Sequence, residues 1–323
     1  MPNNLTLLDV AKNHGSAAEI ALIESVMTHS PELSAFPSTV LQGTSFTTVD
    51  RHKLPNTGFT WANEGIAPSK SLFKTRQVAC HIFRGAVNAD KAVVDAFNME
   101  RKSPGKYQAL EADGVARSAM IELGKQIYYG TDEDAKGFPG LRQLWAAHFP
   151  LSGIGINATG TSANAATSVY AVKFGEQYAQ VVWGGNKVLS LPPFRTESAK
   201  DANGGQYDAY VSNLTSWVGL QCVHPAAIGR IYNLTTEVGK GLTDVLIAQL
   251  LALFPVGFTP DALFMTRQSR LQLQLARTVV LQGNGNAGTM GSTGGLVAPL
   301  PTEAGGIPIV VTDNILNTEA IVV

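Results

Sequence analysis

Apolar residues recur at helical spacing in several parts of the chain. The clearest stripe runs over about 107–129 and predicts a helix roughly 35 Å long, with Gly130 placed to end it. A capping-box sequence beginning at Ser16 precedes a second stripe and predicts a short amphipathic helix over about 16–29. Weaker patterns predict two more helices, near 243–254 and 267–278.

Strand-like segments fill much of the remaining sequence. Two of them, about 44–51 and 71–84, flank turn-rich sequence at 55–58 and 67–69, which together predict one long hairpin. Shorter strands are expected at 168–174, 178–183, 207–211, 261–266 and 306–311. Pro308 in the last of these favours a strand start or an edge. Helices and strands are thus mixed, which predicts an α+β fold.

The composition favours association with other protein chains. The chain has 323 residues, of which 45% are hydrophobic, enough for about two core-bearing units. Only 15% are charged, against roughly 25% in ordinary soluble proteins. With 24 basic and 25 acidic residues, the formal net charge is −1, which argues against a generally basic nucleic-acid binder. Low charge close to neutrality promotes protein–protein association.

The few charges are segregated along the chain. Residues 51–84, in the predicted hairpin, carry a local net charge of +5, whereas residues 107–134, around the predicted long helix, carry −4. An isolated two-stranded hairpin is marginally stable and needs a surface on which to lie. A solvated surface hairpin is the alternative interpretation of the basic segment.

One apparent cofactor motif has the wrong context. Residues 283–288 satisfy G-x-G-x-x-G, but a dinucleotide-binding loop follows a strand and begins a helix. This motif follows a predicted helix and precedes a Gly-, Ser- and Thr-rich segment, which favours a flexible loop. We therefore expect no cofactor.

Other candidate chemistry is also weak. Cys80–His81 and Cys222–Val223–His224 contain zinc-ligand residue types, but not the usual two-to-four-residue spacing. We expect no metal site and no catalytic residues. Two distant cysteines favour reduced thiols in the cytoplasm, and no signal peptide is recognisable. The longest apolar segment, 245–258, is shorter than the ~20 residues that span a bilayer, so we expect a soluble protein without membrane contact.

The order of these segments resembles the major capsid proteins of tailed double-stranded-DNA bacteriophages, which share the Johnson fold. The residues that carry the resemblance lie in order along nearly the whole chain: 5–12, 43–45, Arg51, Leu54, Pro55, Trp61, 63–65, 138–141, Trp217, Gly219, Arg230, Ile231, Asn233, 306–309, Asp313, Ile315 and 318–320.

The resemblance implies a division of the chain into five parts. These are an N-terminal arm (1–43), an extended hairpin loop (44–84), a peripheral domain with a long spine helix (85–150), a mainly axial domain with returning peripheral strands (151–282), and a Gly-rich loop with C-terminal peripheral strands (283–323).

The resemblance further implies a structural protein that assembles into the pentamers and hexamers of an icosahedral head enclosing double-stranded DNA. The protein would reside in the virion capsid after assembly in the cytoplasm of the host bacterium. The hairpin would lie over the peripheral domain of a neighbouring subunit. The expected inter-subunit contacts are Arg51, Lys53, Phe59, Trp61, Lys70, Phe73, Lys74, Arg76, Glu111, Asp113 and Glu122, with Leu72 as a further apolar anchor.

The resemblance also implies partners for the shell, and three other functions are alternatives to it. We expect a homo-oligomer, a separate scaffolding protein, a portal, a cementing protein, and sequence-independent contact with packaged DNA. A lysine–asparagine cross-link, known in some relatives, is not carried over, because Lys70 and Lys74 have no matched asparagine. The alternatives are an encapsulin-like compartment shell, a nucleotide-dependent enzyme built on 283–288, and a secreted β-rich adhesin.

Overall fold

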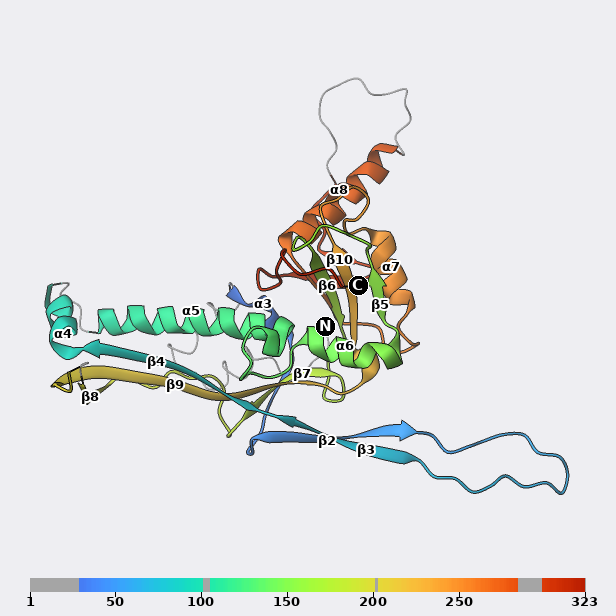
Figure 1. Ribbon diagram of the computed structural model, residues 1–323, viewed down its shortest axis with the longest axis horizontal. Helices are drawn as coiled ribbons and strands as arrows, with labels where there is room; N and C mark the ends of the chain where they lie inside the picture. The colour runs from blue at the N-terminus through green and yellow to red at the C-terminus, as the bar shows by residue number, and fades with distance from the viewer. Residues whose placement is uncertain (1–28, 101–104, 201–202, 284–297, 323) are drawn as a thin grey trace.

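Three parts of the molecule extend from a common centre (Figure 1). The computed structural model describes residues 29–100, 105–200, 203–283 and 298–322. We call the three parts the arm, built on α5, β4, β8 and β9; the hairpin, formed by β2, β3 and the loop between them; and the axial unit, which contains α7, α8 and a six-stranded sheet. The helix expected at 16–29 lies outside the described residues, apart from His29.

The arm combines helices with a five-stranded sheet. The helices are α3 (Pro31–Ala35), α4 (Lys91–Glu100), α5 (Lys106–Tyr129) and α6 (Leu141–Ser152), with a short 3-10 turn η1 (Gly130–Asp132) after α5. The sheet has the order β1-β7-β9-β4, and β8 also pairs with β9. Its strands are β1 (Ser38–Val40), β4 (His81–Asp90), β7 (Ala179–Gly184), β8 (Arg195–Lys200) and β9 (Gln206–Cys222).

Helix α5 confirms the strongest prediction from the sequence. Met120, Leu123 and Ile127 of the predicted stripe are buried in the main core. Gly130 ends the helix with a φ of +59°, a conformation that favours glycine. A Cβ atom at Gly130 would lie 2.0 Å from the backbone nitrogen of Gly140, so the close contact between these two loops also requires glycine.

The hairpin is confirmed, but its second strand is shorter than predicted. β2 (Ser45–Lys53) pairs antiparallel with β3 (Leu72–Ala79). The prediction of one strand over 71–84 is wrong, because the chain passes into the core at Cys80 and continues as β4, which pairs with β9. The Cys80 backbone N–H donates to Thr44 O at 2.9 Å and closes the base of the hairpin. Residues 81–84 therefore belong to the arm.

The axial unit confirms the later helices and strands. Its sheet order is β12-β13-β11-β6-β10-β5. The strands are β5 (Gly155–Asn157), β6 (Thr167–Val172), β10 (Ile228–Leu234), β11 (Ala262–Met265), β12 (Glu303–Ala304) and β13 (Ile307–Val311). Pro308 is the second residue of β13, consistent with a strand start. A 3-10 turn, η2 (Pro225–Ala227), precedes β10.

Helices α7 (Asp244–Ala252) and α8 (Arg267–Gly283) complete the axial unit. The Thr243 side chain accepts a hydrogen bond from Leu246 N–H and so caps α7. Both helices pack on the sheet face that includes Val169 and Ala171, whereas Tyr170 and Val172 face the main core. Within the described ranges, no helix is long and apolar enough to cross a membrane.

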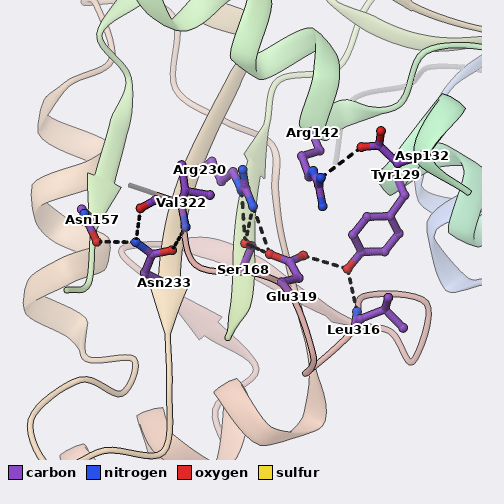
Figure 2. A network of polar contacts seen from close by, with 10 residues as sticks. All are labelled: Tyr129, Asp132, Arg142, Asn157, Ser168, Arg230, Asn233, Leu316, Glu319 and Val322. Carbon is purple, nitrogen blue, oxygen red and sulfur yellow. Dashed lines mark hydrogen bonds and ion pairs between the residues drawn. The ribbon is translucent and has the colours of Figure 1, made fainter. Parts of the chain in front are cut away.

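A buried polar network fixes the arm to the axial unit (Figure 2). The Arg230 guanidinium on β10 lies 3.0 Å from the Glu319 carboxylate and also donates to the Ser168 hydroxyl on β6. Tyr129, at the end of α5, donates to the other Glu319 oxygen at 2.7 Å. Burial, and then the Glu319 charge, raises the pKa of Tyr129, so this phenol remains a donor. Four separate segments of the chain thus meet at one carboxylate.

Removing that carboxylate should destabilise the subunit strongly. In a Glu319→Ala variant, Arg230 would remain buried without its ion-pair partner, which costs about 3–5 kcal/mol of unfolding free energy. Denaturant unfolding of the unassembled subunit measures the loss. The exposed Glu303→Ala variant serves as the control and should stay within about 0.5 kcal/mol of wild type. An equal effect of both substitutions would contradict the structural role of Glu319.

A second buried carboxyl holds the N-terminal segment across α5. Glu32 on α3 is fully buried and accepts a hydrogen bond from the Asn314 side chain, which also donates to His29 O at 3.0 Å. The segment crosses α5 at Gly124, where a Cβ atom would collide with both Glu32 and Asn314. Burial raises the pKa of Glu32, against the opposing effect of its hydrogen bonds. The folded subunit therefore favours the protonated acid.

The raised pKa of Glu32 predicts a pH-dependent stability. Folding stabilised by the proton on Glu32 is fully present below the unfolded-state pKa, near 4.5, and is lost as pH rises through the higher folded-state pKa. A Glu32→Gln variant keeps a neutral side chain at every pH and should lose this part of the pH dependence. Thermal unfolding between pH 4 and 8 measures it. Parallel curves for the variant and wild type would contradict the prediction.

Candidate assembly interface

The register of the hairpin divides the predicted contact residues between two opposite faces. Arg51 pairs with Phe73, and Val49 with Thr75, so these four residues share one face. Lys53 pairs with Leu72 after a bulge at residue 52. Alternation along β3 then places Leu72, Lys74 and Arg76 on the opposite face. One face of the hairpin is therefore mainly basic, and the other combines apolar and polar side chains with Arg51. The two faces cannot both contact the same flat surface.

The apolar face and the loop are unusually exposed. Phe73 is 60% exposed, and the Arg51 guanidinium lies 5.3 Å from the centre of its ring, a cation–π contact. In the loop, Trp61 is 85% exposed and Phe59 fully exposed. Large exposed aromatic groups mark protein–protein contact sites. The hairpin does not bury these side chains within its own subunit.

Arg76 differs from the other predicted cations because it packs against its own subunit. Its side chain is only partly exposed, and its Nε atom is buried without a hydrogen-bond partner among the described residues. Burial raises the pKa of the Cys222 thiol on β9 to about 12, and the nearby charge of Arg76 opposes this shift. Arg76 therefore lies at the root of the hairpin, close to β9. Lys53, Lys70 and Lys74 are exposed.

The predicted acidic residues lie on α5 with different partners. Glu111 and Glu122 are eleven residues apart, about 16 Å along the axis, and share one side of the helix. Asp113 lies on another side and forms an exposed ion pair with Arg117 at 2.8 Å. Glu122 lines a hollow of about 530 Å³ with Arg84, Asp134 and Lys136. Asp134 and Lys136 were not predicted as contact residues, because only the tertiary fold brings their loop beside β4.

The hairpin and the arm point away from the axial unit in opposite directions (Figure 1). Within one subunit, the hairpin loop is therefore far from the acidic side of α5. Arg84 on β4 and Glu122 line the same hollow within one subunit, whereas contact between the hairpin cations and the acidic residues of α5 requires a second copy. Such a contact joins two different surfaces and repeats head to tail, which closes into rings when the rotation allows it.

The cysteine thiols are buried, and His81 and His224 form contacts with the backbone. Cys80 and Cys222 are buried free thiols, and the His224 Nδ1 atom accepts a hydrogen bond from Ala226 N–H at η2. His81 Nδ1 lies 3.0 Å from Lys136 O. Among the residues that the structure describes, no group of three or more His, Cys, Asp or Glu side chains is arranged to hold a metal ion. The G-x-G-x-x-G sequence begins at the last residue of α8, and the rest of it lies outside the described residues.

Solved phage capsid structures share this fold. The structure of bacteriophage Epsilon15 matches with a TM-score of 0.62 and 18% identity, over 88% of this chain and 86% of that chain. The capsid of bacteriophage JBD30 matches with a TM-score of 0.50 and 12% identity, over 86% and 88% of the two chains. The JBD30 capsid decorated with minor capsid protein trimers gives 0.52 and 12%, with 90% of each chain covered. No curated protein has a significantly similar sequence.

The chain therefore shares its fold with solved phage capsid structures over most of its length. Residues 17–323 match the family described as Major capsid protein GP7, and the chain belongs to that family. It is therefore a structural protein of the virion capsid and not an enzyme. This confirms the resemblance to tailed-phage capsid proteins and the predicted fold class, and it removes the nucleotide-dependent enzyme and the secreted adhesin from consideration.

The position of Arg76 predicts an effect on the single subunit. An Arg76→Ala variant should lose about 1 kcal/mol of unfolding free energy, because the buried part of its side chain packs at the hairpin root. Lys74→Ala, two residues away on the same face, should be unchanged because Lys74 is exposed. Thermal unfolding of the unassembled subunit compares the two. Equal stabilities would show that Arg76 does not anchor the hairpin.

Proposed function

We propose that this subunit assembles head to tail into the pentamers and hexamers of an icosahedral phage head enclosing double-stranded DNA. The observation that supports the proposal is that the basic hairpin and the arm, which bears Glu111 and Glu122 on one side of α5, point in opposite directions (Figure 1). Each copy offers its hairpin to one neighbour and its arm to another. The predicted contact residues are the members of these two surfaces, and their role between subunits remains part of the proposal.

The two kinds of hairpin residue contribute differently to such a contact. Exposed ion pairs supply about 0–1 kcal/mol each, so Lys53, Lys70 and Lys74 would mainly set orientation and register. Burial of apolar surface supplies about 25 cal/mol per Å², so Phe59, Trp61 and Phe73 would provide most of the adhesion. On the strands, Lys53 and Lys74 share one face and Phe73 lies on the other, whereas Phe59, Trp61 and Lys70 lie in the loop.

The remaining partners follow from the proposed shell. A scaffolding protein and a portal would act during assembly, and the packaged DNA would contact the inner surface without sequence preference. A cementing protein is supported by the JBD30 capsid, which is decorated with minor capsid protein trimers. An encapsulin-like compartment is the alternative within the same fold, and a bound cargo peptide in place of nucleic acid in purified particles would favour it.

Charge reversal on the exposed part of the hairpin tests the head-to-tail contact. A Lys70→Glu and Lys74→Glu double variant should fold normally but reduce the yield of closed particles at least about tenfold, which corresponds to about 1.4 kcal/mol per contact. Sedimentation and electron microscopy measure the yield, and circular dichroism checks the fold. The Lys70→Arg and Lys74→Arg variant keeps both charges and should assemble normally. Normal yield from the glutamate variant would refute the proposed contact.

A further inference from the structure

One side of helix α5 faces away from the sheet and the main core. Strands β4 and β9 lie along the other side of the helix (Figure 1), where Val115 packs against Gly85 of β4. On the outward side, exposed residues recur at steps of four, three and four positions, which places them on one face of a helix. We call this face the outer stripe of α5: Leu110, Gly114, Arg117 and Ile121.

The outer stripe leaves two large apolar side chains uncovered by the described part of the chain. Leu110 is 56% exposed and Ile121 is 37% exposed. Between them, a Cβ atom at Gly114 would meet no atom of another element within 4 Å, so the helix backbone is open to close approach. Arg117 forms an ion pair with Asp113 on its own helix. An apolar helix face with a glycine near its middle is suited to packing against a second helix.

The N-terminal segment already covers the continuation of the stripe. Gly124 lies three residues beyond Ile121, on the same side of α5. A Cβ atom on Gly124 would collide with the Glu32 carboxylate and the Asn314 side-chain amide. The stripe is therefore covered beyond Ile121, whereas it is exposed from Leu110 to Ile121.

The described structure begins beside the exposed part of the stripe. The buried Ser30 hydroxyl donates to Met120 O, which fixes the N-terminal segment on α5. His29 and Ile121 line the same hollow, which has a volume of about 270 Å³. The chain that precedes His29 is therefore attached next to the exposed part of the stripe.

The preceding sequence matches the stripe in character and length. The pattern over 16–29 predicts an amphipathic helix with one apolar side, formed by Ile20, Ile23 and Met27. A helix over 16–28 would be about 20 Å long, and the outer stripe of α5 spans about 16 Å. The predicted helix is therefore long enough to cover the exposed part of the stripe.

We propose that the outer stripe of α5 is the docking site for residues 16–28 of the same chain, whose apolar side covers Leu110 and Ile121. The segment is attached next to the stripe, so its effective concentration there exceeds that of the same segment in a second copy. Charge would contribute little, since Arg117 already pairs with Asp113. Burial of apolar surface would supply the adhesion.

Cross-linking of paired cysteines tests the docking. In a segment that runs parallel to α5, Met27 would lie opposite Ile121, and Ile20, seven residues earlier, opposite Gly114. An Ile20→Cys and Gly114→Cys double variant should therefore be joined within one chain by a short bis-maleimide. Mass spectrometry of the unassembled subunit detects the link.

A second cysteine pair is the matched control for this cross-link. The native thiols of Cys80 and Cys222 are buried, so we expect neither to compete for the reagent. In an Ile20→Cys and Val245→Cys variant, the second cysteine is also exposed but lies on α7, and at least about tenfold less link should form within the chain. A link between two chains would show that another copy supplies the segment, and no link above the control would show that the stripe is not its docking site. Either result would overturn the proposal.

Hydrogen exchange measures the docking without a cross-linker. Gly114→Glu would place a carboxylate under the docked segment, and the subunit should fold normally because this position has open space around it. Amides of 16–28 should then exchange at least about tenfold faster than in wild type, whereas Gly114→Ala should keep their protection. Equal exchange in wild type and Gly114→Glu would contradict the docking. Both measurements use the unassembled subunit, so their outcome is independent of the head-to-tail assembly proposed above.

Discussion

The buried ion pair between Arg230 and Glu319 is the interaction on which the geometry of the subunit depends. Glu319 lies in the C-terminal segment, Arg230 in the axial sheet, and Tyr129, which also bonds to Glu319, at the end of α5. The Arg230 guanidinium also lies 5.0 Å from the Trp145 ring centre on α6. Two charges buried together are tolerated only when their hydrogen bonds are satisfied. The pair therefore specifies one arrangement of arm and axial unit, and with it the direction in which the arm points.

The fixed direction of the arm determines which charged groups of the subunit can contact one another. A nearly neutral chain with segregated charge could fold back on itself and neutralise its own patches. In this subunit Asp113, Asp132 and Glu133 form ion pairs with cations close to them. The hairpin cations do not reach α5, because the hairpin leaves the centre on the side opposite to the arm (Figure 1). The hairpin cations of one molecule are therefore exposed to other molecules. A structural protein of a shell needs this property, since its main partner is another copy of the same chain.

The sequence predicted long or strongly periodic elements well and missed the three helices α3, α4 and α6. α5, the hairpin, α7, α8 and the strand at 307–311 were all predicted. α6 was missed although Leu141 and Trp145 show helical spacing. α4, a helix of ten residues, was missed although its apolar residues gather on one side. β9 extends to Cys222, far beyond the predicted 207–211, although Leu214, Val218 and Leu220 alternate as a strand requires.

The sequence alone determined the class of the protein, because the order of elements and the scattered family residues can be recognised without knowledge of any tertiary contact. It also determined that basic and acidic charges are separated along the chain. Only the tertiary structure decided how the candidate interface is organised. It separated Lys74 from Phe73 by strand alternation, placed Arg76 against its own β9, and left β4 at the edge of its sheet among the described residues. These properties depend on which strands pair across long sequence separations, and pairing is set by burial in a common core and not by local residue patterns.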